Sequence, residues 1–367
     1  MMKKLCIVYN FAQKYREGIY SLIEREYDCH WVFGDNQTDI KGLDTSFLKS
    51  VQFVMNKKLF GAYYYQKGVV SLLRGYDTFL MLGELINLST WLMLIGCRLF
   101  YPKKKMFLWS HGWYGREGFI KSILKKMYFS MADAVFLYGN YAENVARSQG
   151  YKKNNLFVIH NSLNYEKQIS IRYRLSDSDI FRKHFGNDDY VLIFIGRLTK
   201  IKRLDMLVDA VNALNKVGKK CNLVFVGDGT EKTELVRQVD KLSLSSRVWF
   251  YGACYDEVHN ASLIYNSDLC VAPGNVGLTA MHSMVFGTPV ITHNAFKWQM
   301  PEFEAIKQGV TGSFFEFGKL DSLVNCISVW LDENASRRDA IRENCYNEID
   351  SFWTPGYQMK VLKQHIL

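Results

Sequence analysis

The 367-residue sequence contains no low-complexity segment and no visible repeat of about 20 to 50 residues, so nothing in it is typical of a disordered chain or a repeat architecture. It also lacks an uninterrupted apolar run that could span a membrane. Residues 79–100 come closest, but Glu84, Asn87 and Arg98 interrupt them, and we expect a strand over 78–82 followed by a buried helix over 87–100. The first apolar run, 5–9, is too short for a signal peptide and predicts a strand.

Cysteine pairs of the C-x-x-C type are absent among the eight cysteines. Several cysteines lie instead in apolar segments that resemble strands. This usage is typical of reduced core residues, and it indicates neither a disulfide framework nor a cysteine metal site. We therefore expect a cytoplasmic protein.

Basic residues outnumber acidic ones, and the formal net charge of +10 predicts an anionic partner. Nucleic acid is disfavoured because the sequence shows no helix-turn-helix, zinc-finger or aromatic RNA-binding pattern. A nucleoside diphosphate and an anionic membrane surface fit the charge better.

Short apolar segments alternate with amphipathic ones through residues 1–165. The expected strands are 5–9, 30–33, 51–55, 78–82, 106–110, 134–137 and 157–160, and the expected helices are 17–27, 63–73, 87–100, 119–131 and 141–149. Such alternation predicts a doubly wound parallel sheet. Ligands of such sheets bind outside the carboxyl ends of the strands.

Residues 164–189 have no sustained apolar period and are rich in charge, which predicts a linker. Ser176 and Asp177 are good N-cap residues, so we expect a short helix that begins there and ends at Gly186.

The second half resumes the alternation with an apolar strand over 190–195. This strand ends in Gly196-Arg197, and Lys202 stands just before a helix expected over 204–217. A second strand over 222–226 ends in Gly227-Asp228-Gly229, whose glycines allow backbone to approach a nucleotide closely.

The segment 268–293, DLCVAPGNVGLTAMHSMVFGTPVITH, predicts a strand, a glycine-containing loop, a helix over 278–286 and another strand. At about 100° per residue, Thr279 and His282 lie on the polar side of this helix, opposite Met281 and Val285. The free backbone N–H groups at the start of a helix suit a phosphate.

This segment resembles the nucleotide-sugar site of retaining GT-B glycosyltransferases of family 4. The family pattern is Glu-Gly-Phe-Gly-Leu, three residues, Glu-Ala-Met and then Gly-Thr-Pro-Val. The pairs Gly277-Leu278 and Gly287-Thr288, with Met284, Pro289 and Val290, match it. Gly274 and His282 stand where the family has its two glutamates.

The resemblance implies roles for individual residues. Arg197 and Lys202 would hold the donor diphosphate, and His111, after the strand over 106–110, resembles a histidine that contacts the donor sugar in relatives. We expect these three residues to be catalytic. The residues expected to bind the donor are Gly196, Gly227, Asp228, Gly229, Tyr251, Gly252, Asn275, Gly277, Leu278, Thr279 and His282.

His282 replaces the glutamate that binds ribose in relatives, and a neutral imidazole can still accept a ribose hydroxyl. On this basis, His282→Glu is expected to be tolerated. No metal is expected, because Arg197, Lys202 and the helix dipole would stabilise the leaving diphosphate, and no other cofactor is expected.

The helix over 119–131 is amphipathic, with Lys121, Ser122, Lys125 and Lys126 on one side and apolar residues on the other. Two interpretations remain open: a solvated polar side over a core helix, or a surface that contacts anionic lipids or a lipid-diphosphate acceptor. The residues assigned to that surface are Lys103, Lys104, Lys105, Lys121, Lys125 and Lys126.

The resemblance implies an α/β chain of GT-B type, with two Rossmann-like, doubly wound parallel-sheet domains facing a cleft. The expected parts are an acceptor-binding domain (1–165), the linker (166–189), a nucleotide-sugar-binding domain (190–350) and a final helical segment crossing back (351–367). The expected function is retaining transfer of a sugar from a nucleoside diphosphate sugar to a glycan or lipid-linked acceptor, in the cytoplasm or peripherally on the membrane. A nucleotide-sugar epimerase or hydrolase, and a donor-binding subunit without catalysis, remain alternatives.

Overall fold

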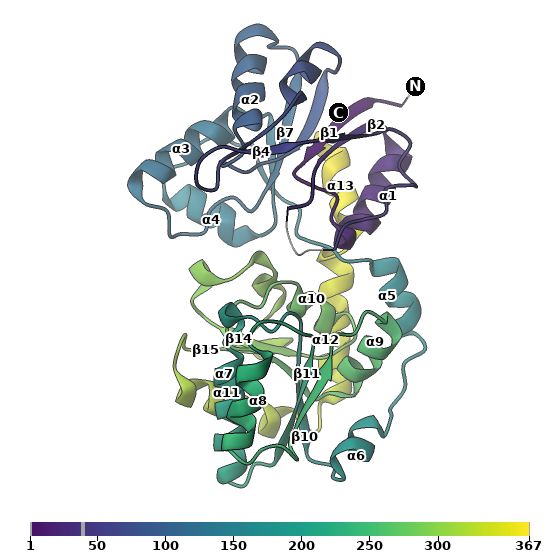
Figure 1. Cartoon of the computed structure of the whole chain (residues 1–367), viewed down its shortest axis with the longest axis vertical. Coiled ribbons are helices and arrows are strands. Elements are labelled where there is room, and N and C mark those ends of the chain that lie inside the picture. The colour runs from purple at the N-terminus through teal and green to yellow at the C-terminus, as the bar shows by residue number, and fades with distance from the viewer. Residues whose placement is uncertain (1, 38–40, 367) are drawn as a thin grey trace. The chain divides into compact units, whose positions relative to one another are not determined.

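The computed structural model describes residues 2–37 and 41–366. The chain forms two compact units, one made of residues 1–164 with 354–367 and the other of residues 165–353. Each unit is built on one parallel β-sheet with helices packed against it (Figure 1). The predicted α/β fold with two parallel-sheet domains is therefore confirmed.

The sheet of the first unit has seven parallel strands in the order β3-β2-β1-β6-β7-β8-β9. The reversal of order at β1 is the mark of a doubly wound sheet. The strands are β1 (Lys4–Tyr9), β2 (Asp28–Gly34), β3 (Val51–Val54), β6 (Thr78–Leu82), β7 (Lys105–Ser110), β8 (Ala134–Leu137) and β9 (Leu156–Val158).

Alternate residues of these strands enter two separate hydrophobic cores, because successive side chains of a strand point to opposite faces. In β1, Leu5 and Ile7 join the core on one face and Cys6 and Val8 the core on the other. The helices of this unit are α1 (Glu17–Glu26), α2 (Leu88–Phe100), α3 (Phe119–Ser130), α4 (Asn140–Ser148) and α13 (Pro355–His365). Burial on both faces explains why the strands read as continuous apolar runs.

The last helix, α13, packs on α1 within the first unit (Figure 1). Met359 and Leu362 enter the same core as β1, and the Ser162 hydroxyl donates to Gln358 Oε1 at 2.6 Å. Lys363 adds an ion pair to Glu26 at 2.5 Å. The C-terminal helix is thus an integral part of the first unit's core.

The helix expected over 63–73 is wrong. Residues 64–66 form strand β5 (Tyr64–Gln66), which pairs antiparallel with β4 (Asn56–Lys58), and only Val69–Arg74 are helical, as the 3-10 helix η2. Gly68, in the left-handed region with φ 85°, separates the strand from the helical turn. The run of tyrosines before it favours a strand.

The second unit has six parallel strands in the order β12-β11-β10-β13-β14-β15. The strands are β10 (Tyr190–Ile195), β11 (Cys221–Val226), β12 (Val248–Gly252), β13 (Leu269–Ala272), β14 (Val290–His293) and β15 (Gly312–Phe315). The helices are α5 (Tyr165–Arg172), α6 (Ile180–Phe185), α7 (Leu204–Lys216), α8 (Lys232–Lys241), α9 (Glu257–Asn266), α10 (Leu278–Met284), α11 (Leu320–Asn334) and α12 (Arg338–Phe352).

The segment read as a linker carries two of these helices, α5 and α6. Helix α6 ends at Gly186 as predicted, with φ 71°, but it begins at Ile180 and not at Ser176 or Asp177. The Ser178 backbone N–H donates instead to Asn266 Oδ1 at 2.8 Å, which holds the preceding loop to the end of α9.

The region tested above as a membrane span is β6 followed by α2, with Asn87 as the N-cap that accepts from the Ser89 N–H. Within the described part of the chain, no helix has both the length and the apolar composition that crossing a bilayer requires.

Candidate functional site

The carboxyl ends of neighbouring strands in the second unit carry most of the residues singled out from the sequence. Gly196 and Arg197 follow β10, and Gly227, Asp228 and Gly229 follow β11. Asn275 and Gly277 lie between β13 and α10, and β12 ends with Tyr251 and Gly252. Because all these strands are parallel, their loops gather at one edge of the sheet.

The two glycine-containing loops pack backbone against backbone. A Cβ on Gly227 would lie 1.9 Å from the Gly196 carbonyl oxygen, so only glycine fits there. The Gly227 N–H donates to the Gly252 carbonyl at 2.8 Å, and the Leu198 N–H donates to the Asp228 carbonyl at 2.9 Å. The glycines therefore allow the two loops to pack against each other. The sequence analysis had expected them to let the backbone approach a nucleotide.

Lys202, at the end of the 3-10 helix η3 (Lys200–Lys202), reaches from the β10 loop to the β13 loop. Its ammonium donates to the Asn275 carbonyl at 2.6 Å and lies 3.4 Å from Asn275 Oδ1. The Gly274 N–H donates in return to the Lys202 carbonyl at 2.9 Å. The two loops are thus joined by both backbone and side chain.

Gly274, at the position of the first glutamate in the resemblance described above, has no room for a side chain. A Cβ there would lie 2.0 Å from the Ile201 carbonyl oxygen, so any side chain would force the two loops apart. The backbone of these two loops therefore requires glycine at position 274.

The charges at this edge are arranged around Lys202. Burial lowers the pKa of the Lys202 ammonium to about 8, opposed by the negative charge of Glu302 and aided by the positive charge of Arg197. Arg197 itself is exposed on the loop after β10. The site combines one exposed and one partly buried cation, which suits an anionic ligand.

Helix α10 begins after Gly277, whose φ of 54° lies in the left-handed region. The helix has seven residues and ends at Met284, earlier than the predicted Phe286. The Thr279 hydroxyl donates to the Ile195 carbonyl at 2.8 Å, which ties α10 to the end of β10. Leu278, beside it, is partly exposed.

His282 has a partner that sequence reasoning missed. Its Nε2 lies 3.0 Å from Oε1 of Glu257, the first residue of α9, and the Gln168 side chain donates to the same oxygen at 2.8 Å. Burial acts to raise the pKa of Glu257, but the hydrogen bonds and charge around it hold that pKa at about 2. The carboxylate is therefore ionised beside the imidazole.

His111 lies in the first unit, directly after β7. Its ring is 4.6 Å from that of Tyr138, and its buried Nδ1 has no hydrogen-bond partner among the described residues. Burial, together with the charges of Arg16 and Lys125, lowers the pKa of His111 to about 4, so the ring is neutral at pH 7.

The lysines assigned to a surface differ in their surroundings. Lys103, Lys105 and Lys121 are exposed, whereas Lys104 lies mostly buried in an ion pair with Asp77 at 2.7 Å. Lys125 is 4% exposed and pairs with Glu117 at 2.6 Å, so its place on an exposed lysine face is corrected. Lys126 donates to the Gln149 carbonyl at 2.9 Å.

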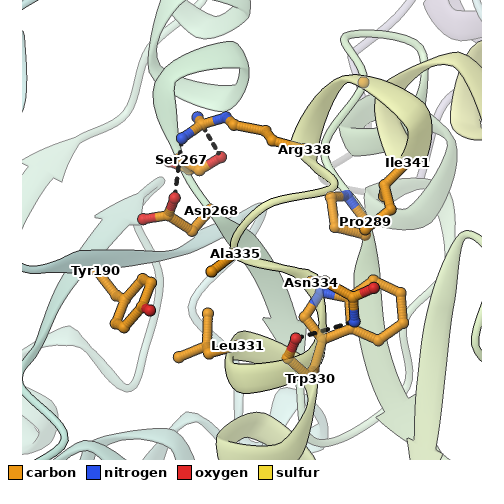
Figure 2. Close-up of a pocket in the computed structure, with 11 residues that line it drawn as sticks. Tyr190, Ser267, Asp268, Pro289, Trp330, Leu331, Asn334, Ala335, Arg338 and Ile341 are labelled. Atoms are coloured by element: carbon orange, nitrogen blue, oxygen red, sulfur yellow. Dashed lines mark hydrogen bonds and ion pairs between the residues drawn. The ribbon is translucent and has the colours of Figure 1, made fainter.

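A pocket in the second unit lies at the end of the sheet where the strands begin, opposite their carboxyl ends (Figure 2). It is bordered by Tyr190, the first residue of β10, and by Asp268, just before β13. Arg338 from the start of α12 pairs with Asp268 at 2.9 Å and donates to the Ser267 carbonyl at 3.1 Å. These contacts anchor α12 to the amino edge of the sheet, away from the strand ends where ligands of such folds collect.

Residues 2–37 and 41–366 contain no group of three or more His, Cys, Asp or Glu side chains that could hold a metal ion. The expectation that no metal is needed stays a prediction.

Part of the chain matches a known protein family. Residues 176–348, slightly less than half of the chain, match the family described as Glycosyl transferases group 1. One similar curated protein is the GDP-mannose-dependent alpha-(1-6)-phosphatidylinositol dimannoside mannosyltransferase of Mycobacterium tuberculosis, 32% identical over 114 residues. That alignment covers 30% of this chain and 29% of the relative, so the chain spans less than a third of that protein's length.

Solved structures resemble the whole chain. The Anabaena Alr3699/HepE protein in complex with UDP has a TM-score of 0.70 at 18% identity, and each chain covers 99% of the other. The apo form of the lipopolysaccharide outer core galactosyltransferase WaaB has a TM-score of 0.71 at 15% identity, with 99% of this chain and 98% of that chain covered. These likenesses establish the GT-B fold.

The contact between His282 and Glu257 changes the expectation for His282→Glu. A second carboxylate so close to that of Glu257 would be repelled, and the hydrogen bond between the two side chains would be lost. We expect this variant to be destabilised by about 1–3 kcal/mol. Urea unfolding followed by circular dichroism, at neutral pH, measures the change.

The control is the double variant His282→Glu with Glu257→Gln, whose amide can donate to the new carboxylate. It should recover most of the lost stability. Equal destabilisation of the single and double variants would show that repulsion from Glu257 is not the cause.

Proposed function

We propose that the chain is a retaining glycosyltransferase that moves a sugar from a nucleoside diphosphate sugar to a glycan or lipid-linked acceptor, without a metal ion. The observation that carries the proposal is the placement of Arg197 and Lys202 on the loop after β10, at the carboxyl end of the second unit's sheet, where Lys202 also contacts the loop after β13. The family match over 176–348 contains both residues. Glycosyltransferase names among the relatives, and the UDP in the Anabaena structure, support a nucleotide-sugar donor.

The two cations suit the chemistry of the leaving group. When the bond between the sugar and the diphosphate breaks, the diphosphate oxygen gains negative charge, and fixed positive charges stabilise that charge in the transition state. Lys202 is held by Asn275 before any ligand arrives, so little reorganisation is needed at the moment of reaction. These side chains would perform the electrostatic role that a metal ion has in other transferases.

Retention of configuration follows from a front-face route in this proposal. The acceptor hydroxyl attacks the anomeric carbon on the side from which the diphosphate departs, and the departing phosphate oxygen takes the hydroxyl proton. The new bond forms to the acceptor oxygen as the bond to the phosphate oxygen breaks. No carboxylate nucleophile is required.

His282 would bind the ribose through one nitrogen. Nε2 of the ring lies 3.0 Å from Oε1 of the ionised Glu257, which leaves Nδ1 to hydrogen-bond a ribose hydroxyl. Glu257 and Gln168 would thus fix the orientation of the ring at the position where the resemblance has a glutamate. His111, neutral at pH 7, would contact the donor sugar.

A thermal-shift screen tests the function. The chain is heated with UDP, GDP, CDP or dTDP and with their sugars, since a ligand that binds the folded state raises the melting temperature. Stabilisation by one nucleotide, followed by sugar transfer from its conjugate to an acceptor pool, supports the proposal. Epimer or free sugar formed without an acceptor would identify an epimerase or hydrolase, and binding without turnover would identify a donor-binding subunit.

Removal of either cation should weaken binding of the cognate nucleoside diphosphate. We expect Arg197→Ala and Lys202→Ala each to reduce affinity by about 10–150-fold, because each loses a charge-assisted contact of about 1.5–3 kcal/mol. Isothermal calorimetry measures the affinity. Arg237→Ala is the control, since this arginine is exposed on α8 and pairs only at the surface with Glu234. Unchanged affinity in both site variants would refute the site.

The affinity for the nucleoside diphosphate should also depend on pH. Lys202 is charged below its pKa of about 8, so binding above that pH must first add a proton, and affinity falls as pH rises. Lys202→Arg keeps its charge throughout this range and should remove this dependence. Calorimetry between neutral and alkaline pH compares the two proteins. If the affinity of Lys202→Arg falls with pH as much as that of the wild type, another titrating group causes the pH dependence.

A further inference from the structure

Helices α2 and α3 of the first unit bury some of their residues in the core but expose nine large apolar side chains. On α3 the exposed fractions reach 81% for Phe119 and 74% for Ile120. We call these residues the apolar face: Leu92, Ile95, Leu99, Phe100, Phe119, Ile120, Ile123, Leu124 and Met127. Contiguous exposed apolar surface of this kind marks an interaction site.

The orientation of α3 follows from what its polar residues bind. Lys125 points inward, where its ammonium pairs with Glu117 and donates to the Gly112 carbonyl at 2.5 Å. The Ser122 hydroxyl donates to Gln149 Oε1 at 2.6 Å, and Lys126 donates to the Gln149 carbonyl. Most of the polar side of α3 is therefore used within the protein, and the apolar side faces outward.

Helices α2 and α3 contact each other, so their exposed apolar side chains belong to the same region of the first unit. The rings of Trp91 on α2 and Tyr128 on α3 lie 4.8 Å apart, and Arg98 Nε donates to the carbonyl of Met131, the C-cap of α3, at 2.7 Å. On α2, Leu92, Ile95 and Leu99 are spaced three and four residues apart and so share the exposed side of the helix.

The two helices that carry the apolar face have basic residues and no acidic ones. Neither the α2 sequence nor the α3 sequence contains an aspartate or glutamate. Lys121 is exposed on α3 itself, and Lys103 and Lys105 follow the end of α2 and are exposed as well, although Lys105 also lies 3.6 Å from Asp133. Apolar side chains bordered by lysines form the pattern of helices that lie in the headgroup region of anionic membranes.

We propose that the apolar face docks the first unit on an anionic lipid bilayer, with its apolar side chains among the acyl chains and its lysines at the headgroups. This surface assignment is independent of the proposed sugar transfer, and it replaces the lysine face read from the sequence. A second copy of the chain is a poorer partner, because a twofold interface would bring Lys121 and its neighbours close to their own copies.

Flotation with vesicles tests the docking surface. The full-length protein is mixed with vesicles of phosphatidylcholine alone or of phosphatidylcholine with phosphatidylglycerol, at low and high salt. We expect flotation with the anionic vesicles, reduced by salt because headgroup attraction is screened. The double variant Phe119→Ser with Ile120→Ser should lower the bound fraction by about tenfold or more, since two side chains no longer enter the membrane.

The matched control is Tyr173→Ser with Val217→Ser, which removes an aromatic and an aliphatic side chain of nearly equal exposure, 80% and 76%, from the second unit. It should float like the wild type, and melting curves should show both variants folded. The proposal is overturned if the wild type does not float, or if both double variants lose binding alike. It is also overturned if light scattering shows a dimer that the first double variant dissociates, with no vesicle binding.

Discussion

The close approach of Gly274 to the backbone of Ile201 and Lys202 is the constraint on which the candidate site depends. The Gly274 N–H meets the Lys202 carbonyl at 2.9 Å, and a Cβ would stand 2.0 Å from the Ile201 carbonyl oxygen. This contact sets the loop after β10 beside the loop after β13, and the Lys202 ammonium then reaches Asn275. A glutamate at 274 would separate the loops and remove the cation from its place, so the motif position is glycine for a geometric reason.

Much of the fold could be predicted from the sequence because it depends on local patterns. Parallel strands with helices on both sides are buried on both faces, so β10 and β11 are continuous apolar runs and were placed almost to the residue. The loops after them could be placed as well, since parallel strands bring their carboxyl ends to one edge of the sheet. The positions of Arg197 and Lys202 at that edge followed from their place between β10 and the helix after it, whereas their role came from the family resemblance.

Other features could not be predicted because they depend on contacts between distant residues. The helical period of α3 shows an apolar and a polar side but not which of them faces the protein. Glu117 and Gln149 settle that orientation, and neither is marked by spacing to Lys125 or Ser122. The expected helix over 63–73 failed for a related reason, since pairing of β5 with β4 outweighs local helical period.

The pairing of His282 with Glu257 shows how a site can keep its carboxylate while the motif loses it. The two residues are 25 positions apart, and they meet because α9 leads directly into β13 and α10. In the resemblance to family 4, His282 occupies the position of a glutamate, and the Glu257 carboxylate lies 3.0 Å from its ring and also accepts from Gln168 at 2.8 Å. The negative charge at this place therefore belongs to Glu257 on α9 and not to α10 itself, and the hydrogen bonds with His282 and Gln168 keep it ionised by holding its pKa at about 2 despite burial.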